Sequence, residues 1–321
     1  MAWGRVVRLE AVNKDGVRVD VADLRIDATC TRSRVFDDNS MEATIFNAND
    51  DTVARFLQRG TNVALYAGYD DEGDPGLMYQ GNIIDSKTYQ RGPDRVTTIR
   101  SMSLRSLTRP FTATPVCLSF LPNSTAKDVL ESIAATLGLV PIGMEMAAEA
   151  VFPSGWTFVG PVSNAFKRLG QDLRAKGMGL YVDLAELVVY RHGATSSYSI
   201  AELGTSTGLL GIQDSTDYME AARSNLASLP SKDSRKNDDP PVMTKEDVDD
   251  VYAYLDGIFT NMKKTYTART LVIPKVRPNS LVRINYPEGG IQGLFVVHRM
   301  NVSVGNGPDS AFFMNLDLLE A

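Results

Sequence analysis

The sequence has few of the residues that most catalytic and metal sites require. Its 321 residues include two cysteines, Cys30 and Cys117, and two histidines, His192 and His298. Cysteines so far apart in the sequence form neither a disulfide framework nor a thiolate metal site. No apolar run approaches the ~18 residues of a membrane span. We therefore expect a soluble chain with little catalytic equipment.

An apolar signal segment and a positive net charge are also missing. Arg5 and Arg8 interrupt the N-terminus, so we expect no secretory signal and a cytoplasmic chain. The 33 Lys and Arg against 39 Asp and Glu give a net charge of −6, which argues against broad nucleic-acid binding. Residues 231–256 hold four basic and eight acidic side chains, so most of the net charge lies in this segment.

The usual catalytic and ligand-binding motifs are missing as well. G-x-S-x-G, H-E-x-x-H and C-x-x-C do not occur. His192 has no local nucleophile pattern, and His298 lies inside a predicted strand, where a packed or solvent-facing side chain is expected. Gly177 and Gly179 precede a strand, whereas a phosphate loop precedes a helix. We predict no catalytic, cofactor-binding or metal site and no cofactor.

The first hundred residues have the pattern of β structure. Strands are predicted at 17–21, 24–28, 41–46, 62–67, 77–89 and 96–103. A short helix is predicted at 52–59, with Asp50 or Asp51 as its N-cap and Gly60 after its end. Short, evenly spaced strands are typical of a barrel or a sandwich.

The middle of the chain changes to helical periodicity. One helix is predicted from residue 124 until Gly138, and a second from about Ser163 to Gly177. A hairpin-like pair of strands follows at 179–191. This pattern indicates a separate α+β unit.

The segment 228–247 is polar and predicts an exposed, mobile loop. A helix follows, with Thr244 as its N-cap and apolar residues from Val248 to Met262 spaced three and four apart. This helix packs either on its own domain or against a neighbouring subunit, and two heptads do not decide between them.

The C-terminal part returns to strands, at 270–273, 281–286, 294–303 and 310–319, and it repeats a pattern from the first part. In both places an extended segment, a strand, a Gly-Pro-Asp turn and another strand follow one another. The turns are Gly92-Pro93-Asp94 and Gly307-Pro308-Asp309. A match of several elements in the same order indicates a duplicated β domain.

The order of elements and several motifs resemble the baseplate hub family of contractile phage tails and related injection machines. The resemblance spans nearly the whole chain, apart from a stretch at about 228–265 that is longer than the family's second barrel needs. The motifs that carry it lie at 41–47, 60–69, 77–83, 124–130, 138–139, 165–169, 207–211, 271–274 and 278–282.

The resemblance implies an α+β, mainly β fold with two similar tube-like β-barrel domains, an intervening α+β domain and a small helical insertion. The implied domains are 1–110, 111–200 and 201–227 with 266–321, with an inserted loop and helix at 228–265. It implies a structural virion protein, assembled in the host cytoplasm, that forms a homotrimeric ring between a sixfold tail tube and a threefold spike. The implied partners are the tail tube protein, the central spike protein, the tape measure and baseplate wedge proteins, and DNA in transit through a channel.

Two other functions remain open from the residues alone. A tail-associated cell-wall hydrolase could use a pair of carboxylates without leaving a motif among the 39 acidic residues. A carbohydrate- or receptor-binding β module would need exposed aromatic side chains on loop tips. Most of the aromatic residues fall in predicted strands and helices, and the repeated β domain favours a ring-forming scaffold.

Overall fold

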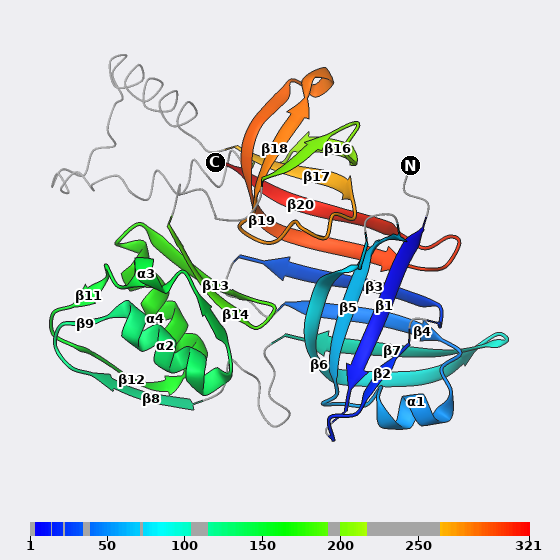
Figure 1. Cartoon of the computed structure of the whole chain (residues 1–321), viewed down its shortest axis with the longest axis horizontal. Helices are drawn as coiled ribbons and strands as arrows, with labels where there is room; N and C mark the ends of the chain where they lie inside the picture. Colours follow the sequence, from blue (N-terminus) through cyan, green and yellow to red (C-terminus); the bar gives the residue numbers. More distant parts are fainter. Residues whose placement is uncertain are drawn as a thin grey trace, which may run out of the picture.

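The computed structural model describes residues 4–13, 15–21, 23–34, 39–70, 73–103, 115–191, 200–216 and 264–321 (Figure 1). The fold is α+β and mainly β, as the sequence predicts. Thirteen of the described strands join in one large sheet, which takes strands from both ends of the chain. The predicted loop and helix at 228–262 lie outside the described residues.

The N-terminal part contributes seven strands and one short helix, α1 (Asp50–Arg55). The strands are β1 (Arg5–Val12), β2 (Arg18–Asp20), β3 (Ile26–Ser33), β4 (Ser40–Phe46), β5 (Asn62–Tyr69), β6 (Gly76–Arg91) and β7 (Asp94–Met102).

The C-terminal part contributes six strands and a short 3-10 helix at Pro287–Gly289. The strands are β15 (Ala201–Gly204), β16 (Leu209–Asp214), β17 (Thr265–Leu271), β18 (Leu281–Tyr286), β19 (Ile291–Gly305) and β20 (Phe312–Glu320).

The middle unit has its own hydrophobic core around three helices, α2 (Ala126–Leu137), α3 (Met144–Ala147) and α4 (Val162–Arg174). Small sheets surround these helices, and every buried residue of this core lies between Val116 and Val189. Its strands are β8 (Pro115–Phe120), β9 (Ser124–Thr125), β10 (Val140–Ile142), β11 (Val151–Phe152), β12 (Trp156–Pro161), β13 (Met178–Asp183) and β14 (Glu186–Arg191).

The helix ends follow the capping residues of the sequence. Thr125 caps α2 and forms a capping box with Asp128, and Gly138 ends the helix with a φ of 69°. For α1 the predicted cap was wrong. Asn49, and neither Asp50 nor Asp51, accepts the hydrogen bond from the Thr52 backbone, so the helix begins earlier and also ends earlier than predicted.

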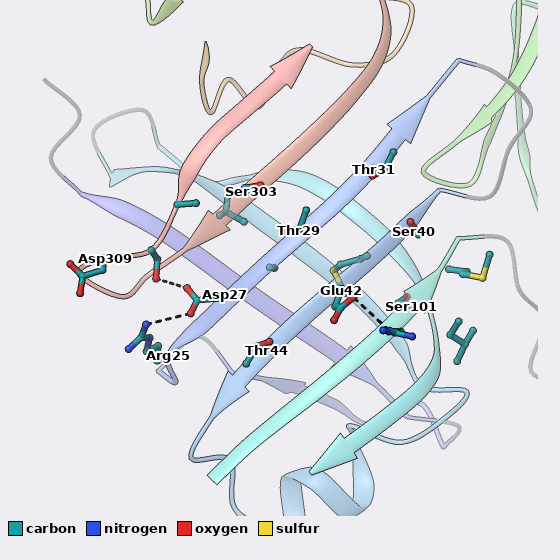
Figure 2. A pocket seen from close by; sticks show the side chains of 18 residues that line it. Arg25, Asp27, Thr29, Thr31, Ser40, Glu42, Thr44, Ser101, Ser303 and Asp309 are labelled. Atoms are coloured by element: carbon teal, nitrogen blue, oxygen red, sulfur yellow. Dashed lines mark hydrogen bonds and ion pairs between the residues drawn. The ribbon is translucent and has the colours of Figure 1, made fainter. Parts of the chain in front are cut away.

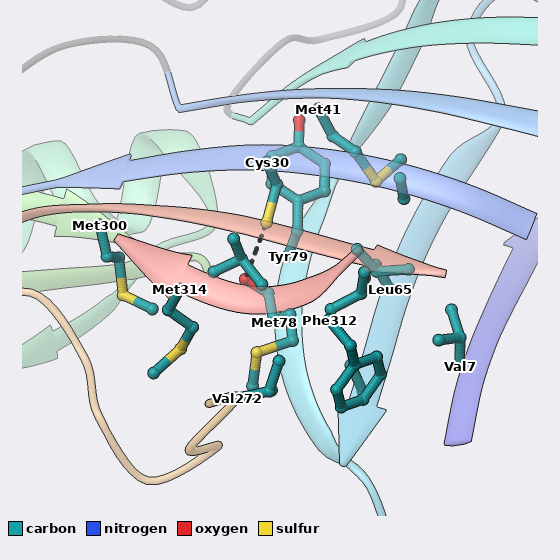
Figure 3. Close-up of a cluster of buried hydrophobic side chains, with 14 of the residues drawn as sticks. Val7, Cys30, Met41, Leu65, Met78, Tyr79, Val272, Met300, Phe312 and Met314 are labelled. Atoms are coloured by element: carbon teal, nitrogen blue, oxygen red, sulfur yellow. Dashed lines mark hydrogen bonds between the residues drawn. The ribbon is translucent and has the colours of Figure 1, made fainter. Parts of the chain in front are cut away.

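The large sheet folds over on itself because two of its strands bend. β6 has an extra residue between Ile83 and Asp85, and β19 has one between Val297 and Arg299. Such a β-bulge bends a strand and increases its twist. In Figure 1, β1 and β5 therefore cross over β3 and β4. Between the layers lies one shared core, which contains methionines from both ends of the chain (Figure 3).

The same strand order occurs twice in this sheet. In the N-terminal part the order is β1-β5-β6-β7-β4-β3, and in the C-terminal part it is β15-β18-β19-β20-β17-β16. The two Gly-Pro-Asp turns connect equivalent strands, β6 to β7 and β19 to β20. The parts differ in that β1 is antiparallel to β5 whereas β15 is parallel to β18, and β2 has no counterpart among the described strands.

The two parts join edge to edge, because β19 pairs with β3. The described strands do not close into a barrel, so the prediction of two tube-like barrels is not seen in that form. The sequence-based prediction also missed β1, α3, the short strands β8 to β12, and β15 and β16.

Candidate functional site: the polar face of the large sheet

One face of the large sheet is polar over eight consecutive strands, from β16 through β17, β20, β19, β3, β4 and β7 to the second half of β6. Side chains alternate along each strand, so the residues that do not enter the core point to this face. In β3 these are Asp27, Thr29 and Thr31, while Ala28 and Cys30 are buried. Figure 2 shows the same alternation in the neighbouring strands.

The charges on this face balance. By alternation and register, five acidic and five basic side chains of the paired strands point to it. They are Asp27, Glu42, Asp85, Asp94 and Asp317, and Lys87, Arg91, Arg100, Arg269 and Arg299. The excess negative charge of the chain therefore does not gather here.

A hollow with a volume of about 770 Å³ lies at the centre of the polar face, between β3, β4, β7 and the β19–β20 turn (Figure 2). Its floor is held by polar contacts across strands. Glu42 lies 3.5 Å from Arg100, and Thr31 donates a hydrogen bond of 2.8 Å to Asn301. Asp27 lies 3.5 Å from Arg25 and accepts a hydrogen bond from Ser310.

This hollow lacks the environment of a glycosidase acid. Asp27 and Glu42 each face an arginine, whereas a carboxyl that acts as general acid lies among apolar side chains. In the described residues, no group of three His, Cys, Asp or Glu side chains could hold a metal ion. None of the described helices is long and apolar enough to span a membrane.

His298 is the one histidine among the described residues. His192 lies outside the described residues. His298 is the extra residue of the bulge in β19, and its backbone oxygen accepts a hydrogen bond of 2.9 Å from the Arg34 backbone. Burial lowers the pKa of His298, and the positive charges of Arg34 and Arg299 lower it further.

The cysteines also differ from a reactive pair. Cys30 is buried under the sheet, and burial raises the pKa of its thiol to about 12. Cys117 is exposed on β8. Both are free thiols.

A buried ion pair attaches the middle unit to the sheet, and the sequence reasoning missed it. Arg32 on β3 donates from Nε to Asp183 on β13 at 2.9 Å and makes a second, shorter contact through Nη2. Its Nη1 donates to the Met78 carbonyl at 3.2 Å, and Asn39 donates to Asp183 at 3.4 Å. Burial alone lowers the pKa of Arg32, but the adjacent Asp183 carboxylate outweighs it and the pKa is raised. The signal in the sequence is an arginine at a core-facing position, after Ile26, Ala28 and Cys30 in alternation.

Comparison with known proteins finds similar folds among solved structures. No family model and no curated protein matches the sequence. The tail protein from Neisseria meningitidis MC58 matches with a TM-score of 0.61 at 13% identity, covering 99% of this chain and 97% of its own. The 43 kDa tail protein of prophage MuSo2 from Shewanella oneidensis matches with a TM-score of 0.62 at 12% identity, covering 98% of both chains.

A third similar structure comes from a secretion machine. This E. coli protein is a component of the type VI secretion system, described as similar to tail proteins of bacteriophage T4. It matches with a TM-score of 0.54 at 9% identity, over 93% of this chain and 74% of its own. At these identities the likeness shows the fold. The chain has the fold of phage tail proteins, as its sequence motifs indicate.

Proposed function

We propose that the chain is the structural hub of a contractile-tail baseplate. Three copies form a closed ring that joins a sixfold tail tube to a threefold spike and surrounds a channel for DNA. The protein acts by assembly and carries out no catalysis. Its place is the tail of the virion, after assembly in the host cytoplasm.

The observation that carries this proposal is the repeated strand order. Each chain holds two similar β units, and three chains would supply six of them around one axis. Six similar units match a sixfold tube, while the differences between the two units leave threefold symmetry for a spike. The direction of β15 and the absence of a described counterpart for β2 are such differences.

The polar face is suited to the wall of the channel. It is hydrophilic over eight strands and is hollowed at its centre. The charges on this face balance, and Glu42 and Arg100 are paired across strands, so the face gives DNA no strong attractive patch and DNA can slide past without being held.

Each part of the chain has its own place in the proposed assembly. The units at 1–110 and at 201–227 with 266–321 form the ring, and the α+β unit at 111–200 stands on it, fixed by Arg32 and Asp183. The tail tube protein and the central spike protein bind on opposite sides of the ring. Tape measure and wedge proteins are further partners of the same assembly.

Light scattering during size-exclusion chromatography tests the ring. Three copies of 35.1 kDa give an expected mass of about 105 kDa. A monomer or a dimer at high protein concentration would contradict the hub. The hydrolase alternative is tested by incubating the pure protein with peptidoglycan, where we expect no turnover. Turnover that disappears in Glu42→Gln would favour the hydrolase instead.

A further inference from the structure

Two strand edges are equivalent to the two strands that join the units of one chain, and both edges are open among the described strands. The second half of β19 pairs antiparallel with β3, and this contact joins the C-terminal unit to the N-terminal unit. The strand equivalent to β19 is β6, and the strand equivalent to β3 is β16. Among the described strands, β16 pairs only with β17, and the second half of β6 pairs only with β7. These two open edges lie at opposite ends of the sheet in Figure 1.

The equivalence can be followed residue by residue across each unit. In the N-terminal unit, residues paired across β6, β7, β4 and β3 form a row, which is Lys87, Thr98, Thr44 and Asp27. The equivalent row across β19, β20, β17 and β16 of the C-terminal unit is Asn301, Asn315, Arg269 and Gly211. The bulges give the same alignment for β6 and β19, since each bulge comes directly after the fourth residue before the row, Ile83 in β6 and Val297 in β19.

These rows fix a register for the open edges. Inside the chain, Ser303 of β19 lies opposite Thr29 of β3. Two residues beyond the row in β6 stands Tyr89, the equivalent of Ser303. Two residues beyond the row in β16 stands Gln213, the equivalent of Thr29. The internal junction therefore maps onto a pairing of Tyr89 with Gln213.

Both open edges can accept this pairing. Residues 84–91 and 209–215 contain no proline, so each backbone N–H is able to donate. The β6 edge carries Asp85, Lys87 and Arg91, a net charge of +1, while β16 carries Asp214 and a net charge of −1. Each edge also exposes a large apolar side chain, Tyr89 at 49% and Leu210 at 56%. Edges of this kind invite pairing with another chain.

We infer that the second half of β6 in one copy pairs antiparallel with β16 of the next copy, with Tyr89 opposite Gln213. The partner is a second copy of this chain, and the inference rests on the proposed ring. Every junction around the ring, within and between chains, then has the same strand geometry. The contact is head to tail, so it closes only as a ring, and each chain adds eight strands to a continuous sheet.

Disulfide trapping tests the register. Opposed residues of antiparallel strands have Cα atoms about 4.5–5.5 Å apart, within reach of a disulfide. The background carries Cys117→Ser, and Cys30 stays because it is buried. The test variant is Tyr89→Cys with Gln213→Cys. Its matched control is Tyr89→Cys with Ile212→Cys, one position out of register. Ser303→Cys with Thr29→Cys is the equivalent pair inside the chain and serves as the reference.

We expect mild oxidation of the test variant to give a covalent trimer on a non-reducing denaturing gel. The out-of-register control should remain monomeric on that gel, and the reference should form its disulfide within single chains. A trimer by light scattering that does not crosslink through Tyr89→Cys and Gln213→Cys, while the reference does, overturns this interface and leaves the proposed hub intact. Equal crosslinking of the out-of-register control overturns it too. A monomer in solution overturns both.

Discussion

A buried ion pair is one of the contacts that hold the middle unit against the sheet, beside a hydrogen bond from the Tyr181 hydroxyl to the Pro278 carbonyl. Arg32 is 0% exposed and Asp183 is 4% exposed, and they belong to elements about 150 residues apart in the sequence. A buried pair contributes little net stability compared with apolar side chains, but removal of one partner leaves an uncompensated charge in a dry environment. We therefore expect the pair to help specify where the unit attaches.

Replacement of Asp183 should destabilise the protein strongly. In Asp183→Asn the shape is kept, but the Arg32 charge loses its counter-ion, so we expect a loss of about 3 kcal/mol or more in the free energy of unfolding. Urea unfolding followed by fluorescence measures this. The matched control is Glu186→Gln on the same hairpin, whose 3.5 Å pair with Arg277 is partly exposed and should cost less than about 1 kcal/mol. Similar losses in both variants would show that the buried charge is not the cause.

At the scale of elements, local signals determine where the helices of the middle unit begin and end. The Thr125 side chain accepts a hydrogen bond from the Asp128 backbone, and the Asp128 carboxylate accepts from the Thr125 backbone at 2.7 Å and from its hydroxyl. These bonds lower the pKa of Asp128. The first turn of α2 is thus fixed by residues that are adjacent in sequence.

Loss of this cap should be measurable. Thr125→Ala is expected to cost about 1 kcal/mol in the free energy of unfolding. A lowered carboxyl pKa stabilises the fold above its unfolded value of about 4 and loses this effect as the pH falls through the folded value. The difference between the wild type and Thr125→Ala should therefore shrink from pH 7 to pH 3. Lys127→Ala, in an exposed pair at 3.8 Å, is the control and should change stability by less than about 0.5 kcal/mol. An unchanged difference at pH 3 would contradict the role of Asp128.

For the whole molecule, the division of the cores decides what can fold alone. The core of the middle unit lies within residues 116–189. The core of the large sheet combines buried residues from 7–99 with others from 203–318, and β3 has one of its two neighbours in the C-terminal part. The two β units are therefore similar in strand order but depend on each other for burial.

Fragments should reveal this dependence. Residues 111–200 alone are expected to unfold cooperatively in urea and to give dispersed amide NMR signals, because their core is complete. Residues 1–110 alone should be poorly folded or aggregate, because the β3 edge and part of the shared core are uncovered. A stable, monomeric 1–110 fragment with a cooperative transition would show that the first unit is an independent domain.

The sequence by itself determined the local features of this protein. Strand alternation, the α2 and α4 helices, the end of α2 at Gly138 and the repeated Gly-Pro-Asp turns could all be predicted, because each depends on residues close together in the sequence. The short α1 was misplaced because three neighbouring residues could all act as its cap, and only the bond from Thr52 to Asn49 distinguishes them.

Tertiary structure decided what depends on residues far apart. The β19–β3 junction pairs Ser303 with Thr29, and the attachment of the middle unit pairs Arg32 with Asp183. Backbone pairing depends little on side-chain identity, so no local sequence pattern predicts which two strand edges pair with each other. The bulges that follow Ile83 and Val297 bend two long strands for which the sequence predicts no bend. They turn two repeated units into one folded sheet, with a shared core on one side and a polar face on the other.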